Sequence, residues 1–211
     1  QSRYLGDGVH RMEPWLSFFA SYFEDGRRPE EWILQCEDHE VAKIMMHQTQ
    51  RLISLAEDLP LIRPHDECLR LAFLLICAEH IAKLEDGSDG QGESRKYVKQ
   101  FFEKFVEGKD QDRLAHGFQE VTNAPAKPMT LEDRLKKVVD LLYDTRCKLI
   151  HEGATWGLTF HDGVTSMISG EPPVEVKITI TDLQRIVVKG CIAAITRKLS
   201  KEMVKRQACD L

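Results

Sequence analysis

The feature that most constrains the fold is the recurrence of apolar residues at helical spacing along nearly the whole chain of 211 residues. Three stretches rich in Gly, Pro, Ser or Asp interrupt this pattern, at residues 86–92, 123–128 and 153–173. Helices joined by such turns predict an all-α protein, an antiparallel helical bundle with additional N-terminal helices. The helices are expected at residues 14–23, 29–58, 66–84, 94–106, 110–121, 130–153 and 181–206.

The interval before the last helix does not follow the helical pattern. Residues 155–160 and 174–180 carry β-branched side chains that alternate in part, and turn residues lie between them. We therefore predict a small irregular β-hairpin inserted before the final helix.

Two of the expected helices have clear internal signals. Thr130, with Asp133 three residues on, forms an approximate capping box, and Gly153 is placed to end the helix that starts there. The helix at residues 66–84 is apolar nearly all round, as a central bundle helix would be, yet Glu79 and His80 lie within its apolar run. A buried carboxylate at Glu79 needs a partner.

Composition bounds the class of protein. With 42% hydrophobic and 30% charged residues the chain is too apolar to be disordered, and its length suits one core, so we predict one domain over residues 1–211. We divide it into a helical extension at about 1–64 and a core at about 65–206. The longest uninterrupted apolar run, residues 71–78, is far shorter than the roughly 20 residues of a membrane-spanning helix, so no membrane span is expected.

Charge and cysteine content limit the binding partners and the cellular compartment that we expect. The net charge of −5 argues against a protein that coats nucleic acid through overall charge, although the basic segment at residues 181–211 could face an anion or simply be solvated. The six cysteines form no CxxC pair, which favours free thiols in a reducing compartment, and we expect a cytoplasmic protein.

Arg146 breaks the apolar stripe of the helix at residues 130–153. A guanidinium cannot be neutralised, so it must be paired, hydrogen-bonded or reserved for an anion. Glu79 is the obvious partner, and the pair would be either purely structural or a support that orients Arg146 toward phosphate. His151, five residues later, is either a helix-end histidine or a second functional group.

The sequence lacks the motifs that mark several common classes of enzyme. The chain contains no phosphate-binding loop, dinucleotide fingerprint, zinc-protease motif or nucleophile elbow, and we predict neither a cofactor nor a metal. The polar run at residues 37–40 could imitate metal ligands but is more typical of a solvated helix face. A Cys–His nucleophile built on Cys77 or Cys147 has no sequence guidance, and the aromatic run at residues 15–23 suits a core or dimer contact better than base stacking.

Two segments resemble a known family. Residues 141–153, Leu-Leu-Tyr-Asp-Thr-Arg-Cys-Lys-Leu-Ile-His-Glu-Gly, resemble the Arg-x4–6-His signature of HEPN domains, particularly the Apea-like branch, in which a Tyr precedes the Arg and a Gly follows the His. Residues 70–80 resemble the apolar helix of that branch, which ends in Ala/Leu-Glu. The resemblance covers roughly residues 66–206.

The resemblance implies an all-α bundle, commonly a homodimer, and in many members a metal-independent endoribonuclease of host defence, toxin–antitoxin systems or RNA processing. It implies Arg146 and His151 as the catalytic pair, with Glu79 as their polar support. The implied substrate is single-stranded RNA, and an antitoxin or regulatory protein is a further implied partner.

One position departs from that pattern. Many active members carry Asn, Asp or His directly after the Arg, whereas this chain has Cys147. The departure favours the alternative that the chain is a catalytically inactive HEPN module for RNA or nucleotide binding, or for dimerisation and regulation. A helical scaffold that joins other proteins is a third possibility, in which Arg146 and His151 lie apart and closed off from solvent.

Overall fold

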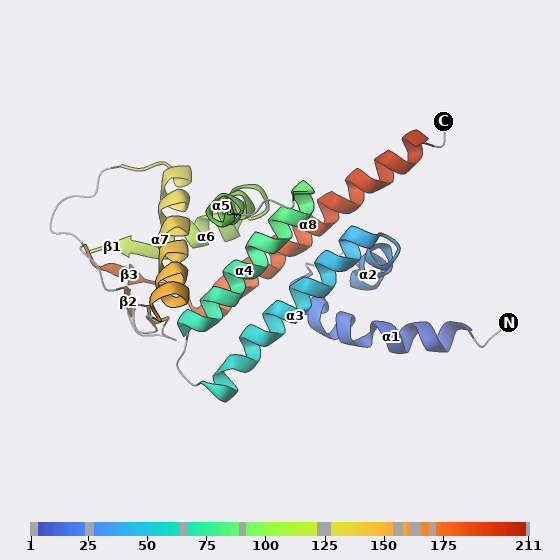
Figure 1. Cartoon of the computed structure of the whole chain (residues 1–211), viewed down its shortest axis with the longest axis horizontal. Coiled ribbons are helices and arrows are strands. Elements are labelled where there is room, and N and C mark those ends of the chain that lie inside the picture. The colour runs from blue at the N-terminus through green and yellow to red at the C-terminus, as the bar shows by residue number, and fades with distance from the viewer. Residues whose placement is uncertain are drawn as a thin grey trace.

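The computed structural model describes residues 4–23, 28–63, 67–88, 92–121, 128–153, 158–160, 166–168 and 172–209. In these parts of the chain, helices dominate and one small sheet is present, which confirms the predicted all-α bundle (Figure 1). The elements in chain order are α1 Tyr4–Phe19, the 3-10 helix η1 Ala20–Tyr22, α2 Pro29–Glu37, α3 Glu40–Ile62, α4 Glu67–Asp86, α5 Ser94–Lys104, α6 Gly108–His116, β1 Phe118–Glu120, α7 Leu131–Glu152, β2 Ser166–Ile168, β3 Val174–Val176 and α8 Ile180–Cys209.

Three long helices, α3, α4 and α8, lie side by side at the centre of the molecule (Figure 1). α3 runs antiparallel to α4, whereas α8 runs in the same direction as α4. The parallel pair keeps one register over most of its length, since three contacts spread along it each join residues 114 positions apart. These contacts are Arg70 with Gln184, Cys77 with Cys191, and the Leu84 carbonyl with Lys198.

α4 is the central helix, as its sequence predicts. It contacts α3, α5, α7 and α8, so nearly every face of it is covered. Its apolar side chains supply much of the single buried cluster of the described residues. The residues that α4 buries completely are Leu71, Leu74, Leu75, Cys77, Ala78, Ile81 and Ala82.

α7 begins and ends where the sequence predicts. The Thr130 hydroxyl accepts a hydrogen bond from the backbone N–H of Asp133 at 3.1 Å, which satisfies one of the free donors at the helix start. Gly153 adopts a left-handed conformation with φ of 66° and donates its N–H to the carbonyls of Lys148 and Leu149. α7 crosses the direction of α4 steeply and contacts α4, α5 and α6 (Figure 1).

The small sheet differs from the prediction in two places, the hairpin before the last helix and the end of the helix expected at residues 110–121. It has the order β1-β3-β2, with β3 paired antiparallel to both neighbours. The predicted hairpin is therefore only half right: β3 lies where expected, but its hairpin partner is β2, and among the described residues 158–160 only Leu158 forms a bridge, an isolated one to Ile168. Residues 155–157 lie outside the described part of the chain.

The predicted helix at residues 110–121 was wrong at its C-terminal end. α6 stops at His116 and β1 follows, because the backbone of residues 118–120 pairs with β3 instead of continuing the helix. Gly117 allows the backbone between α6 and β1 to lie close to Ile178, since a Cβ atom at this position would be 2.5 Å from the Ile178 side chain.

Two expected helix boundaries in the N-terminal part were also wrong. α1 begins at Tyr4 and includes Pro14, because the aromatic face after Pro14 packs onto the following helices: the Trp15 ring stacks on His47 with centroids 4.2 Å apart. The long helix expected at residues 29–58 begins at Pro29 but divides into α2 and α3 at His39, which is extended (φ −127°, ψ 111°).

The His39 side chain stabilises this break, since its Nδ1–H donates to the Gln35 carbonyl at the end of α2. Pro60, expected to end the second helix, lies inside α3, which continues to Ile62. Its missing N–H costs one hydrogen bond in a last turn whose Leu61 and Ile62 side chains are exposed.

α8 is entered through a reciprocal capping box at Thr179, two residues before the expected helix start at Thr181. The Thr179 hydroxyl accepts from the Asp182 N–H at 3.0 Å, and the Asp182 carboxylate accepts from the Thr179 N–H at 3.2 Å. In the part of the chain that the structure describes, the helices lack the combination of length and apolar character needed to cross a bilayer.

Candidate functional site

The first element of the candidate site is Arg146, held at the edge of the buried face of α7. That face is built from residues at helical spacing that pack toward α4 and α5. Arg146 follows the buried Thr145 and leaves only 16% of its side chain exposed. The buried positions of α7 are Leu135, Val138, Val139, Leu142, Thr145 and Leu149.

Glu79 on α4 is the partner of Arg146, as predicted from the pattern. Its Oε2 atom lies 3.5 Å from Nη2 of Arg146, and the Glu79 side chain is 12% exposed. A carboxylate placed this deep must be compensated by charge and hydrogen bonds. The structure thus brings two of the three predicted site residues together.

Two residues that the sequence did not single out hold the other oxygen of Glu79. Lys83 donates to Oε1 at 2.7 Å from one turn further along α4, and the Ser94 hydroxyl donates to the same atom at 2.7 Å from the first turn of α5. Because Oε1 is held in this way, Oε2 is directed to Arg146. The spacing of Lys83 to Glu79 is a helical i, i+4 pair visible in the sequence, whereas nothing in the sequence marks Ser94.

The pairing with Glu79 uses only some of the hydrogen-bond donors of the Arg146 guanidinium. A guanidinium has five N–H donors. Arg146 directs Nη2 to Glu79, and its Nε atom is buried with no hydrogen-bond partner in the described structure. The guanidinium therefore has N–H donors beyond the one directed to Glu79, although Nε itself is shielded and meets an anion only if neighbouring side chains move.

Tyr143 lies one turn before Arg146 and connects the site to α5. Its ring lies 5.5 Å from the guanidinium carbon of Arg146 and 4.8 Å from that of Arg95, distances that suit cation–π contacts. Ser94 and Cys147 lie close enough to its hydroxyl to influence its pKa. Burial raises the pKa of Tyr143, and the Cys147 thiol raises it further, although Arg146 and Ser94 act in the opposite direction.

Cys147, the residue that departs from the family pattern, is half-buried beside Tyr143. Its thiol lies close enough to the Tyr143 hydroxyl, one turn earlier on α7, to raise the pKa of that hydroxyl. Cys147 supplies neither the charge nor the strong hydrogen bonds of an Asn, Asp or His.

An ion-pair network fixes α5 against α7 beside this cluster. Arg95 donates to Asp140 at 3.0 Å and to Asp144, and Lys99 lies 2.8 Å from the other oxygen of Asp140. These pairs are more exposed than the Glu79–Arg146 pair, so each contributes little stability by itself. Their consequence is that the first turn of α5, which carries Ser94, is held against α7.

His151 lies apart from Arg146 and Glu79. It is an exposed residue of the last turn of α7, and it makes no hydrogen bond or ion pair with the described residues. Five residues of α-helix separate it from Arg146 by about 140° around the axis and roughly 7.5 Å along it. Within one chain, the imidazole and the guanidinium therefore do not point to the same place.

His80, next to Glu79 on α4, is half-buried beside the cluster. Burial lowers the pKa of its imidazole below the ordinary value of 6.5, and the positive charge of Lys83 lowers it further, while Glu79 acts in the opposite direction. The neutral form of His80 is thus favoured in the fold.

The other candidates from the sequence have structural roles. The run at residues 37–40 is divided by the break between α2 and α3: Glu37 pairs with Lys43 and His47, and His39 is buried. Among the described residues no group of three or more His, Cys, Asp or Glu side chains is placed to hold a metal. Of the five cysteines with described side chains, all free, four are buried.

Comparisons of the chain with protein-family models, with curated proteins and with solved structures gave no match.

Proposed function

We propose that the chain is a metal-independent endoribonuclease of HEPN type that cleaves single-stranded RNA. The observation that carries the proposal is the state of Arg146: Glu79 orients its guanidinium through one nitrogen, while Nε lacks a partner. A positioned guanidinium with spare donors is suited to bind two oxygens of a phosphate.

The chemistry requires a base and a phosphate-binding group. RNA supplies its own nucleophile, the 2′-hydroxyl. His151 removes the 2′ proton, the 2′ oxygen attacks the phosphorus, and Arg146 stabilises the negative charge of the phosphorane. The bond from phosphorus to the 5′ oxygen then breaks and that oxygen takes up a proton, which leaves a 2′,3′-cyclic phosphate and a 5′-hydroxyl.

The separation of His151 from Arg146 within one chain makes a homodimer part of the proposal. In a two-fold dimer the surface around the end of α7 meets its own copy, so the arginine of one protomer can share a phosphate with the histidine of its partner. Ile150, beside His151, is 51% exposed and supplies an apolar contact for such an interface. Single-stranded RNA is the proposed substrate because in-line attack requires a flexible backbone.

The test uses the full chain, a labelled single-stranded RNA and an excess of EDTA. We expect cleavage with cyclic-phosphate ends by the wild type, and a loss of at least about 100-fold for His151→Ala and for Arg146→Ala. His116→Ala is the matched control, because His116 is also exposed in the last turn of a helix and is expected to leave cleavage unchanged. Cleavage that survives His151→Ala contradicts the proposal.

A specific observation favours a second candidate, the catalytically inactive HEPN module that binds RNA or a nucleotide or serves dimerisation. Arg146 is mostly buried in its pair with Glu79, and Cys147 stands where many active members carry Asn, Asp or His. This candidate predicts RNA binding without cleavage by the wild type, together with a large loss of stability in Arg146→Ala. The partners that we propose in either case are single-stranded RNA and an antitoxin or regulatory protein, in the cytoplasm and with a role in defence.

A further inference from the structure

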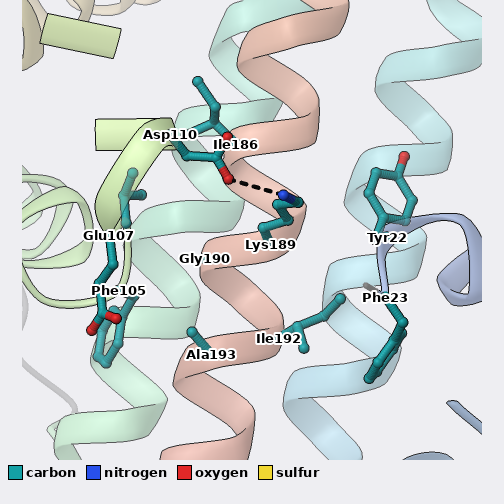
Figure 2. Close-up of a pocket in the computed structure, with 11 residues that line it drawn as sticks. Tyr22, Phe23, Phe105, Glu107, Asp110, Ile186, Lys189, Gly190, Ile192 and Ala193 are labelled. Carbon is teal, nitrogen blue, oxygen red and sulfur yellow. Dashed lines mark ion pairs between the residues drawn. The ribbon is translucent and has the colours of Figure 1, made fainter. Parts of the chain in front are cut away.

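A hollow on the face of α8 shares no lining residue with the cluster around Arg146. It is bounded on one side by Phe23 after η1 and on the other by Phe105 and Glu107, which lie between α5 and α6 (Figure 2). Its volume is about 190 Å³. We call it the α8 pocket and define it by Phe23, Phe105, Glu107, Asp110, Lys189 and Ala193.

The floor of the α8 pocket is shallow because the helix carries small side chains there. Gly190 and Ala193 lie on the same face of α8, and Ile186 and Ile192 flank them. Gly190 has a second reason to be small, since a Cβ atom there would lie 2.7 Å from the Phe101 ring. The pocket is therefore a consequence of close packing between α8 and α5.

Aromatic rings form two of its walls. Phe23 and Phe105 line it from opposite sides of α8 (Figure 2). Both rings are held in place by others: Phe23 lies edge-on to Trp32 with centroids 5.3 Å apart, and Phe105 lies edge-on to Phe101 at 5.8 Å. Walls of this kind suit a flat apolar ligand. The Arg197 guanidinium already lies 5.9 Å from the centre of the Phe105 ring, so the carboxylate of Glu107, and not that ring, is the group that would attract a ligand cation.

The charges at the pocket have a negative excess. Asp110 and Lys189 form an ion pair at 3.2 Å and balance each other (Figure 2). Glu107 is exposed at the mouth and has no ion pair or hydrogen bond with described side chains. The N-terminus of α6 offsets this carboxylate by about half a charge. The cation nearest the Phe105 wall, Arg197, is paired with Glu85 at 3.4 Å, so Glu107 is left as the carboxylate of the lining without an ion pair among the described side chains.

We propose that the α8 pocket binds a small aromatic amine, with the ring against Phe23, Phe105 and Ala193 and the ammonium group toward Glu107. The volume is sufficient for one ring, since a cavity of about 150 Å³ accepts benzene. The excess carboxylate selects a cation over a neutral or anionic ring of the same shape.

The experiment compares benzylamine, benzyl alcohol and benzoate at pH 7 by titration of the full chain, followed by amide NMR spectra. We expect benzylamine to shift the amides of residues 105–110 and 189–193 and to bind more tightly than benzyl alcohol, with benzoate weakest. Glu107→Gln should weaken benzylamine about fivefold, the upper range for one exposed ion pair, and leave benzyl alcohol unchanged.

Two further variants complete the design. Ala193→Leu fills the pocket and should abolish binding of all three probes, whereas Glu103→Gln, an exposed carboxylate of α5 outside the pocket, should change nothing. The proposal is overturned if benzylamine shifts no amide of the pocket, if benzyl alcohol binds as tightly, or if Glu103→Gln weakens binding as much as Glu107→Gln. If Ala193→Leu fails to fold, the comparison of Glu107→Gln with Glu103→Gln decides alone.

Discussion

Glu79 on α4 lies 3.5 Å from Arg146 on α7 through one carboxylate oxygen, while its other oxygen is held by Lys83 and Ser94. Three elements, α4, α5 and α7, thus meet at one carboxylate. This arrangement makes Glu79 both a support for the guanidinium and a contributor to the packing of the bundle, and the two roles can be separated by measurement.

Glu79→Ala leaves the ammonium of Lys83 and the guanidinium of Arg146 without their shared carboxylate. Because the pair is mostly buried, we expect the free energy of unfolding to fall by about 2–3 kcal/mol in urea denaturation. Glu132→Ala removes the exposed pair with Lys136 and should cost less than about 0.5 kcal/mol. Equal effects of the two substitutions would contradict the supporting role of Glu79.

His151→Ala should leave the fold nearly intact. The imidazole is exposed and makes no hydrogen bond with the described residues, so we expect the free energy of unfolding to change by less than about 0.5 kcal/mol. Arg146→Ala should cost at least about 2 kcal/mol, because it removes one of the two cations that compensate the buried Glu79 carboxylate and leaves Lys83 and Ser94 to hold it alone. Calorimetric unfolding of both variants checks the contrast; a His151→Ala loss as large as that of Arg146→Ala would show that the histidine is structural.

His80 makes stability depend on pH. Since burial lowers its pKa in the folded chain, the unfolded chain takes up the proton first as the pH falls. Its contribution to stability is present above about pH 6.5 and is lost as the pH falls from there through the folded pKa. NMR titration of the His80 ring should give a midpoint below 6.5, and His80→Gln should reduce the loss of stability between pH 7.5 and pH 5.5. A midpoint at or above 6.5 would refute this.

Gly153 is required by its backbone conformation. At a φ of 66° a side chain introduces strain, so Gly153→Ala should destabilise the chain by about 1 kcal/mol. Gly153→Asn should cost less, because Asn tolerates the left-handed region better than other residues. Both values come from urea denaturation, and an Ala variant as stable as the wild type would mean that α7 can end in another way.

Local signals explain what could be predicted. Thr130 and Gly153 fix both ends of α7 through contacts within a few residues, and the all-round apolar pattern of α4 predicts a central helix. The pairing of Glu79 with Arg146 also follows from the sequence, because each is a charge within an apolar pattern and each needs the other.

The features that could not be predicted depend on contacts between distant segments. β1 forms because residues 118–120 pair with residues 174–176. No local sequence pattern near His116 predicts this pairing. The break at His39 carries neither Gly nor Pro and is stabilised by the bond from the His39 side chain to Gln35. Ser94 joins the site only because α5 packs against α4 and α7.

The pairing of Phe118 with Val176 has a consequence for how the chain can vary. The segment between these partners begins and ends at adjacent positions in the sheet, and α7 lies within it, packed against α4, α5 and α6. Because both ends of the segment meet at one place and α7 is held by its own contacts, a change in the length of the segment's linkers need not disturb the shared register of α4 and α8.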